Sequence, residues 1–357
     1  MSNSNKTVCI VGVFPPPVHG FALINEAMKK LILESEPSSV VYDLSSYALS
    51  RTPTVIFSRF VKFIVNYPKY LSSSIFNKYH THYIGLSGGL GQFYDILFLL
   101  IARITQQRIF IHHHSFSYLN KKKIATYLTI WMAGRKATHI VLCNKMKNNL
   151  QEYRKILSYT VQSNSGFLIY KNAPFQKNRQ LKTIGFLGNI SIKKGIKKFF
   201  KTLEKLNSRQ IIGLIGGPFQ DSISENYTRK ELKNNSYITY LGPIYNEDKD
   251  NFFNNIDVLL MPSILEEAEP IVIHEAMSHG IPVIAFNKGC IAEIAEHDPG
   301  LIVDSNFSNN AAKLINEWID NPKIFNQIRN NAYNRYQENI NKANITLELL
   351  ISHITNK

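Results

Sequence analysis

The sequence has few cysteines, no long uninterrupted apolar segment and, over a large part of its length, almost no acid. Cys9, Cys143 and Cys290 are its only cysteines, and they lie far apart. This spacing argues against a disulfide framework and a cysteine-rich zinc cluster, and it favours a reducing compartment. The longest apolar run, residues 96–104, contains Arg103 and is too short to cross a bilayer. We therefore expect a cytoplasmic protein.

The length of 357 residues suits two domains of roughly 150 residues each. Hydrophobic residues make up 44% of the chain and charged residues 19%, a composition typical of globular rather than disordered or fibrous proteins. Near the N-terminus, a short apolar stretch at residues 8–14 runs into Pro15, Pro16 and Pro17. A signal peptide needs a longer apolar region and a cleavage site of small residues, so we expect a first β-strand here.

Acidic residues are nearly absent between residues 44 and 151. This segment holds fourteen Lys or Arg and one carboxylate, Asp95, so it carries +13 of the formal net charge of +15. Such one-sided charge indicates a polyanionic partner or surface. No zinc-finger spacing, basic zipper or RRM-like aromatic signature supports nucleic acid as that partner. An anionic membrane surface explains more.

Residues 53–68 predict a basic amphipathic helix. Its apolar residues recur at helical spacing and its polar residues lie on the other side: Phe57, Phe60, Val61, Ile64 and Tyr67 against Arg59, Lys62 and Asn66. A basic helix rich in aromatic residues is suited to a lipid interface. The alternative is a helix packed on its own sheet with a solvated basic face, and both interpretations stay open. Under the first, the basic surface over residues 51–147 would hold the chain on anionic bilayers.

Strand and helix patterns alternate along the chain and then start again. In the first series, strands are expected at residues 8–13, 40–44, 82–86, 108–112 and 137–143, with helices at 21–33, 94–105 and 145–156. In the second series, strands are expected at 183–187, 210–215, 238–241, 257–261 and 282–286, with helices at 196–206 and 272–279 and a helical tail from 311. This alternation predicts two Rossmann-like domains with parallel sheets, joined by a linker near residues 172–175.

Two glutamates follow the strand at residues 257–261. Glu267 lies in the loop, and Glu275 lies inside a helix that opens near Pro270. Ligands bind at the carboxyl ends of parallel strands, and backbone amides at a helix N-terminus, here around Glu269, Pro270 and Ile271, can hold a diphosphate. The helix carboxylate can accept hydrogen bonds from a ribose diol, and the loop carboxylate can accept them from sugar hydroxyls. The pattern suits a nucleotide sugar, although two acids at this spacing are weak evidence by themselves.

The whole stretch 262–284 resembles the Glu-x7-Glu signature of retaining glycosyltransferases of family 4, which have the GT-B fold. Other segments resemble that family in the same order: the loop at 185–195, the glycine turn at 215–218, the segments 240–242 and 256–258, and the N-terminal loop at 11–20. The resemblance is strongest over 184–294 and vague over 45–77. It implies two Rossmann-like βαβ domains, residues 1–175 and 176–330, facing a central cleft. A C-terminal helix over 331–357 would return to the first domain.

The resemblance also assigns donor-binding residues. Lys194 would contact the donor diphosphate, Gly188 and Gly216 would form the donor loops, and Gly20 would approach the donor phosphate and the acceptor. The family usually has arginine where Asn189 stands, and an uncharged amide cannot make the bidentate contact of a guanidinium. Asn189 is therefore the weaker candidate, and Lys194 with helix amides, or Lys193, would hold the diphosphate.

Three histidines follow one another at the end of the strand at 108–112. Alternation places His112 and His114 on one face and His113 on the other, so the three cannot readily share one metal ion. The family has one functional histidine at this point, facing the sugar. His114, at the end of the strand, is the first choice for it and His113 the second; a purely structural role for all three stays open.

Asp248 and Asp250 form an Asp-x-Asp pattern that is superficially metal-binding. They lie at the expected start of a helix, where acids interact favourably with the dipole in any case. We expect no metal, no cofactor and a metal-independent reaction.

The implied reaction is the transfer of a hexose-type sugar from a nucleoside diphosphate to a hydroxyl group, with retention of configuration by front-face attack. Lys194 and amides near Glu269 and Ile271 would stabilise the departing diphosphate, and Glu267 would position the sugar. The acceptor would be a glycan or an undecaprenyl-diphosphate-linked glycan of a surface polysaccharide: O-antigen, capsule or lipopolysaccharide. The enzyme would be cytoplasmic or peripheral on the inner face of the cell membrane.

Rival functions make different demands on the sequence. A nucleotide-sugar epimerase can share the two-domain layout but needs no membrane-seeking basic domain. A dinucleotide-dependent oxidoreductase needs Gly-x-Gly-x-x-Gly after the first strand, where this chain has the proline-rich loop at 15–20. A nucleic-acid-binding protein would explain the charge but not the pair of glutamates, and its signature would be binding with a steep salt dependence.

Overall fold

A computed structural model describes residues 7–17, 20–46, 53–76, 79–120, 122–156, 158–167, 179–245, 247–295, 300–302 and 305–356. The chain divides into two compact units, here called unit 1 (Met1–Leu168 with Asn341–Lys357) and unit 2 (Ile169–Ile340). The predicted linker at 172–175 lies outside the described residues.

Unit 1 is built on a parallel sheet with the strand order β2-β1-β3-β4-β5-β6. Its strands are β1 (Val8–Gly12), β2 (Val40–Asp43), β3 (Thr81–Gly85), β4 (Arg108–His112), β5 (Thr138–Val141) and β6 (Ser158–Val161). All residues of β1 and β3 are buried, as expected for central strands that helices cover on both faces.

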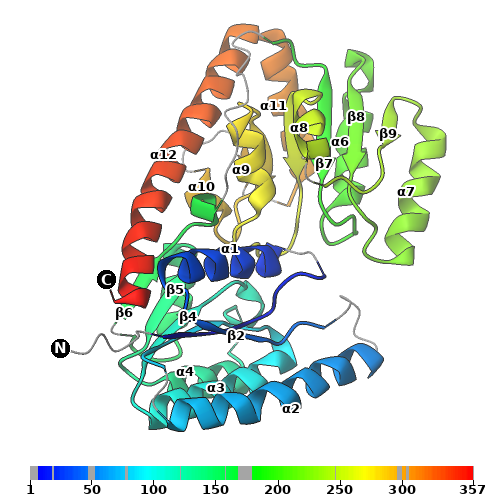
Figure 1. The fold of residues 1–357 in the computed structure, drawn as a ribbon. Coiled ribbons are helices and arrows are strands. Elements are labelled where there is room, and N and C mark those ends of the chain that lie inside the picture. The colour runs from blue at the N-terminus through cyan, green and yellow to red at the C-terminus, as the bar shows by residue number, and fades with distance from the viewer. Residues whose placement is uncertain are drawn as a thin grey trace. The chain divides into compact units, whose positions relative to one another are not determined.

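The helices of unit 1 lie on both faces of its sheet. They are α1 (Gly20–Ser35), α2 (Pro53–Ile75), α3 (Gln92–Ile104), α4 (Ile124–Ala133) and α5 (Asn144–Gln151). Helix α1 covers one face, and α2, α3 and α4 lie together on the other, with α3 in contact with both of its neighbours (Figure 1).

Unit 2 is also built on a parallel sheet of six strands, in the order β12-β11-β10-β7-β8-β9. Its strands are β7 (Thr183–Leu187), β8 (Ile212–Gly216), β9 (Ile238–Tyr240), β10 (Val258–Met261), β11 (Val283–Phe286) and β12 (Leu301–Ile302). Its helices are α6 (Ile196–Lys205), α7 (Ser222–Asn234), α8 (Glu247–Asn254), α9 (Ile271–Ser278), α10 (Ile291–Ile294) and α11 (Phe307–Asp320). The predicted α/β fold with two parallel sheets is confirmed.

Two apolar cores hold the sheet of unit 2. Phe199 of α6 packs with Ile315 and Trp318 of α11 on one face. Ile273 and Met277 of α9 pack on the other. The central strands β7, β10 and β11 are almost wholly buried, which fixes the loops at their carboxyl ends.

The last helix is longer than predicted. We expected it over 331–357, whereas α12 runs over Pro322–Thr355. Proline is favoured at the first position of a helix, where its missing N–H costs nothing, and this explains the earlier start. The part from Asn341 onward belongs to unit 1, where Leu347, Leu350 and Ile354 join the core beside β1.

Helix α2 also runs further than predicted, because Pro68 does not end it. A proline removes one hydrogen bond to the carbonyl four residues earlier. Here that carbonyl belongs to Ile64, whose side chain is 51% exposed, so water can reach this side of the helix. None of the helices in the described part of the chain has both the length and the apolar character that a membrane-spanning segment requires.

Candidate functional site

The carboxyl ends of β7 and β10, which are neighbours in the sheet of unit 2, bring a lysine and a glutamate together. Lys194 follows β7, Glu267 follows β10, and Lys194 Nζ lies 2.7 Å from Glu267 Oε1. The hydroxyl of Ser263 donates to the same oxygen at 2.6 Å. The side chains of Lys194 and Glu267 keep 32% and 14% of their surface exposed, so a ligand can reach both.

Glycine lets these loops approach each other closely. Gly195 has φ +93°, and a Cβ there would collide with the carbonyl oxygen of Pro262. The amide of Ile264 donates to the carbonyl of Lys193 at 3.0 Å and fastens the two loops. At the next strand, Gly217 has φ +124°, and a Cβ there would collide with the carbonyl oxygen of Gly188. Side chains are therefore excluded from the places where the loops touch.

Gly188 and Gly216, both predicted as donor-loop residues, meet at this edge of the sheet. The amide of Gly188 donates to the carbonyl of Gly216 at 3.1 Å, and Gly188 has φ +143°. Asn189, the weaker candidate, is exposed beside them, and Lys193 is also exposed. Of the two lysines in the loop, Lys194 is the one that contacts Glu267.

Helix α9 begins at Ile271, directly after Pro270 in an extended conformation. Glu269 turns inward, and its Oε1 lies 2.9 Å from Nε2 of His274, with both side chains almost completely buried. This contact anchors the first turn of α9. Glu269 and Ile271 therefore offer backbone amides at a helix N-terminus, where amides attract anions, whereas Pro270 has no N–H to donate.

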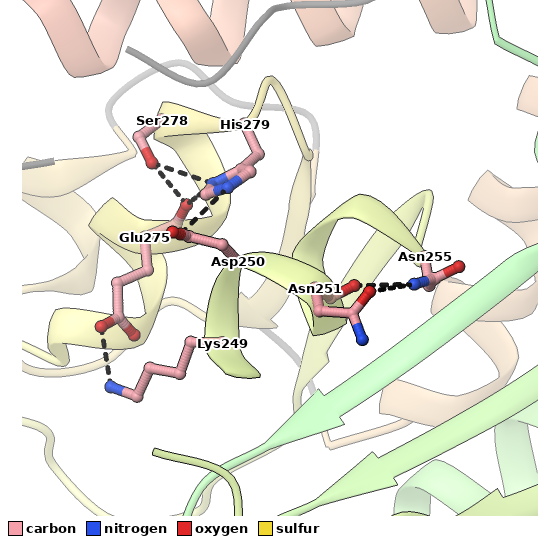
Figure 2. A network of polar contacts seen from close by, with 7 residues as sticks. All are labelled: Lys249, Asp250, Asn251, Asn255, Glu275, Ser278 and His279. Atoms are coloured by element: carbon pink, nitrogen blue, oxygen red, sulfur yellow. Dashed lines mark hydrogen bonds and ion pairs between the residues drawn. The ribbon is translucent and has the colours of Figure 1, made fainter. Parts of the chain in front are cut away.

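Glu275 lies in the middle of α9 and is buried. Its carboxylate faces Lys249 of α8, with Lys249 Nζ 2.7 Å from Glu275 Oε1 (Figure 2). The C-terminal turn is closed by the hydroxyl of Ser278, which donates to the carbonyl of Glu275 at 2.7 Å. A buried carboxylate costs much free energy unless it is paired, and Lys249 is such a partner for Glu275.

Asp248 and Asp250 point to different sides of α8, as residues two apart on a helix must. Asp250 lies beside His279, at 3.5 Å, whereas Asp248 lines a cavity of about 590 Å³ with Asn251 and Asn255 (Figure 2 shows all of these except Asp248). The two carboxylates do not converge on one point. In the part of the chain that the structure describes, no group of three or more His, Cys, Asp or Glu side chains could hold a metal ion.

The three histidines belong to unit 1, and only His114 is partly exposed. Nδ1 of His112 lies 2.7 Å from the hydroxyl of Tyr83, and Nε2 of His113 lies 2.9 Å from Nδ1 of His139. Burial lowers the pKa of His112 and of His113 well below the ordinary value, so both rings are neutral. The ring of His114 packs against that of His112, with centroids 3.9 Å apart and the two planes tilted by 41°. Of the three, His114 keeps surface for a ligand.

Gly20, the remaining candidate, begins α1 in unit 1 and is exposed; a Cβ there would meet nothing within 4 Å. The donor-binding candidates from Gly188 to Glu275 thus lie in unit 2, while Gly20 and His114 lie in unit 1.

Sequence reasoning missed Ser263 and Lys249. Ser263 was part of the matching stretch, but nothing in its spacing says that its hydroxyl binds Glu267. Lys249 stood between the two aspartates that drew attention as a metal pattern. The signal that could have pointed to Lys249 is its place as the one cation between acids in the first turn of a helix.

Comparison with known proteins shows which proteins and folds this chain is similar to. Residues 170–335 match the family model described as glycosyl transferases group 1. An uncharacterised glycosyltransferase of Methanocaldococcus jannaschii, MJ1607, is 24% identical over 183 residues, 47% of this chain and 46% of that protein. The chain thus matches about half the length of that relative. An uncharacterised 41.2 kDa protein in the cps region of Klebsiella pneumoniae is 22% identical over 339 residues, 87% of this chain and 89% of that protein.

Among solved structures, Anabaena HepE in complex with UDP-glucose has a TM-score of 0.72 at 17% identity, covering 97% of this chain and 99% of that one. The chain therefore has the GT-B fold, and residues 170–335 of it are similar to glycosyl transferases of group 1. These matches favour a transferase over the epimerase and nucleic-acid interpretations.

Proposed function

We propose that the chain transfers a sugar from a nucleoside diphosphate sugar to a hydroxyl group of a glycan or lipid-linked glycan, with retention of configuration. The observation that carries this proposal is the pairing of Lys194 with Glu267 at the carboxyl ends of β7 and β10. The binding of UDP-glucose by the structurally similar HepE supports a nucleotide sugar as the donor.

The chemistry follows from where charge develops. Departure of the diphosphate builds negative charge, which Lys194 and the amides at the start of α9 would stabilise without moving far. Glu267 is held at one oxygen by Lys194 and Ser263, and it would orient the sugar as its anomeric carbon gains oxocarbenium character. Attack by the acceptor on the same face gives retention. The role of His114 toward the sugar stays a prediction of the resemblance.

The donor is identified by a thermal-shift screen of nucleotide sugars on the full chain. A ligand that binds only the folded state raises the melting temperature by mass action. We expect one class of nucleoside diphosphate sugar to stabilise the protein, and the Lys194→Ala variant to respond less. A chain that no nucleotide sugar stabilises, and that transfers no sugar from any of them, would refute the proposed function.

Activity is expected to survive EDTA. The positive charge that a divalent cation would supply to the diphosphate comes from Lys194 in this proposal, and Asp248 and Asp250 diverge. The measurement compares initial rates of the full chain before and after chelation, with added Mg²⁺ or Mn²⁺ as the control. Complete loss of activity that either cation restores would contradict a metal-independent reaction.

We further propose that the enzyme works on an anionic membrane surface in the synthesis of a surface polysaccharide. The relative in a cps region supports the polysaccharide role. Helix α2 supports the proposed membrane association, because its outward face is apolar, with Phe57 64% and Val65 53% exposed. The charge of unit 1 adds long-range attraction to anionic lipids.

The polar side of α2 faces unit 1 itself, which revises the residues that would meet the membrane. Lys62 Nζ lies 2.6 Å from a carboxylate oxygen of Asp43, and Asn66 donates to the carbonyl of Asp43. Arg59 donates to the hydroxyl of Ser87 at 2.7 Å. The attractive charge therefore comes from exposed cations such as Lys69 and Lys122, while aromatic and aliphatic residues of α2 would enter the interface.

Replacing Phe57, Phe60 and Ile64 together by Gln is expected to shift the protein from sedimenting with anionic vesicles to the supernatant. These side chains are exposed, so the fold loses little packing. The control replaces by Gln two other exposed apolar residues, Ile223 of α7 and Ile345 of α12, which are 73% and 63% exposed. Wild-type protein that ignores anionic vesicles at low salt, or a control that is released as fully as the α2 variant, would rule out this membrane face.

A further inference from the structure

Unit 1 contains a cavity of about 560 Å³ that the donor site does not use. It lies where the loops after β1 and β3 meet α2 and α3, so it is again at the carboxyl ends of parallel strands. A 3-10 turn, Gly89–Gly91, and the first residues of α3 form one wall. The volume is that of a small-molecule site.

Hydrogen-bond donors gather in this cavity. Gln92 is completely buried and lines it; its Oε1 accepts from Thr126, while its Nε2 has no hydrogen-bond partner among the described residues. Arg59 and Lys123 add two cations, and Nε of Arg59 is buried without a partner in the same described part. A buried donor without an acceptor costs about 1–3 kcal/mol, so a ligand that supplies acceptors is favoured.

The guanidinium of Arg59 is held in a prepared position. Its Nη2 donates to the hydroxyl of Ser87, and the amide of Ser87 donates to buried Asp95 at 2.8 Å. A Cβ at position 91 would lie 2.7 Å from Cβ of Ser87 and 2.8 Å from both Nη atoms of Arg59, so Gly91 leaves room for the guanidinium in this position. Burial raises the pKa of Asp95 to about 6, against a smaller lowering by Arg59. Asp95 does not itself line the cavity, but at neutral pH its negative charge offsets the charge of one of the two cations.

No carboxylate is among the described residues that line the cavity, and apart from Ser46, Ser87 and three glycines its remaining wall is apolar. Two of these apolar residues are strongly exposed at the rim: Leu90 at 74% and Phe93 at 51%. Phe57 of α2 follows the lining residue Ile56 in the chain and is 64% exposed. Ile124 of α4 stands between the lining residues Lys123 and Ala125 and is 81% exposed. An anion-binding pocket with an apolar surround suits an amphiphile whose head is a phosphate.

We propose that this cavity, lined by Arg59, Gln92 and Lys123, binds the phosphate of a lipid-linked acceptor, whose chain lies along the exposed apolar residues of α2, α3 and α4. The inference rests on the proposed function and narrows its acceptor from any glycan to one carried on a lipid phosphate. The start of α3 adds its dipole to the two cations, which favours an anion further.

The test is calorimetric titration of the full chain with farnesyl phosphate, with farnesol and inorganic phosphate as separate arms. We expect farnesyl phosphate to bind and each of the other two to bind at least about tenfold more weakly, because each supplies only half of the recognised chemistry. Arg59→Gln is expected to weaken binding of farnesyl phosphate about tenfold or more. Lys123→Gln, at an exposed position with little risk to folding, is expected to weaken it several-fold.

Arg103→Gln is the matched control, because Arg103 is an exposed cation of α3 that donates to the carbonyl of Trp131 and does not line the cavity. Its affinity for farnesyl phosphate should equal that of the wild type. The proposal would be overturned if the Arg59 and Lys123 variants bound farnesyl phosphate as tightly as the wild type, or if the Arg103 variant lost as much affinity as they do. It would also be overturned if inorganic phosphate bound as tightly as farnesyl phosphate. If farnesol bound as tightly as farnesyl phosphate, the site would recognise only the apolar chain, and the proposal would be overturned as well.

Failure here is separable from failure of the proposed function. Stabilisation by a nucleotide sugar is measured on the same variants. Arg59→Gln should leave it unchanged, since Arg59 is not one of the donor-binding candidates, which apart from Gly20 all lie in unit 2. A protein that binds nucleotide sugar but not farnesyl phosphate keeps its transferase function and loses this acceptor. One that binds farnesyl phosphate through Arg59 but no nucleotide sugar keeps the site and loses the transferase function.

Discussion

Replacing Lys194 by alanine is expected to lower kcat for sugar transfer by about 10²–10³-fold, the loss typical of removing one group that stabilises charge in the transition state. Lys194 is the cation that the loop after β7 places beside Glu267, with Nζ 2.7 Å from Oε1. Its removal leaves the departing diphosphate without a counter-charge and Glu267 without one of its two partners. Steady-state kinetics with the donor found by the thermal-shift screen measure the effect.

The neighbouring lysine provides the control for this experiment. Lys193 is exposed and contributes its backbone carbonyl to the loop contact with Ile264. Lys193→Ala removes the same charge from the same loop but should leave kcat close to that of the wild type. Because the Lys194–Glu267 pair is partly exposed, neither variant should lose much stability. Equal losses of kcat in both variants would mean that the overall charge of the loop, rather than Lys194, assists the reaction.

The strands that the sequence predicts best are those with apolar runs and a clear turn signal. Arg108–His112 and Thr183–Leu187 coincide with the observed β4 and β7 residue for residue. The strand β6, Ser158–Val161, was not predicted, because an edge strand is half exposed and its Ser, Tyr and Thr give no apolar run. Helix α7 was missed because only two of its thirteen residues, Ser224 and Thr228, are buried.

Helix α2 shows where a correct pattern still leaves the orientation open. The spacing separates an apolar side from a polar side, but it does not say which one faces the sheet. The structure turns the polar side inward, because Asp43 and Ser87 lie where Lys62 and Arg59 can reach them. Asp43 is the last residue of β2 and Ser87 follows β3, and periodicity within one helix holds no information about partners on other elements.

The candidate site was predictable only in part for the same reason. Spacing and resemblance pointed to Lys194, Glu267 and Glu275 as separate residues. The contacts among them and their partners are not local: 73 positions separate Lys194 from Glu267, and 26 separate Lys249 from Glu275. The first pair meets because β7 and β10 are neighbours in the sheet, and strand order does not follow from the alternation of strands and helices.

Glu275→Gln is expected to raise the KM for the nucleotide sugar by about 5- to 150-fold while kcat changes little. In the proposal, this buried carboxylate accepts hydrogen bonds from the ribose diol, and losing such a charged acceptor costs about 1–3 kcal/mol. The ribose is remote from the reacting carbon, so the ground state and the transition state lose the same interaction, and the loss appears in KM rather than kcat. Glutamine keeps the shape of the side chain, and α9 should stay folded.

Two further variants separate a role in binding from a role in folding. Glu317→Gln replaces an exposed acid of α11 and should leave both KM and the melting temperature unchanged. Lys249→Gln removes the partner that holds Glu275 Oε1 at 2.7 Å. Since Lys249 acts through Glu275, its loss should raise KM less than Glu275→Gln does. An unchanged KM in folded Glu275→Gln would exclude the carboxylate from donor binding. If Glu275→Gln and Lys249→Gln both lower kcat and the melting temperature but leave KM unchanged, the Lys249–Glu275 pair only stabilises the packing of α8 and α9.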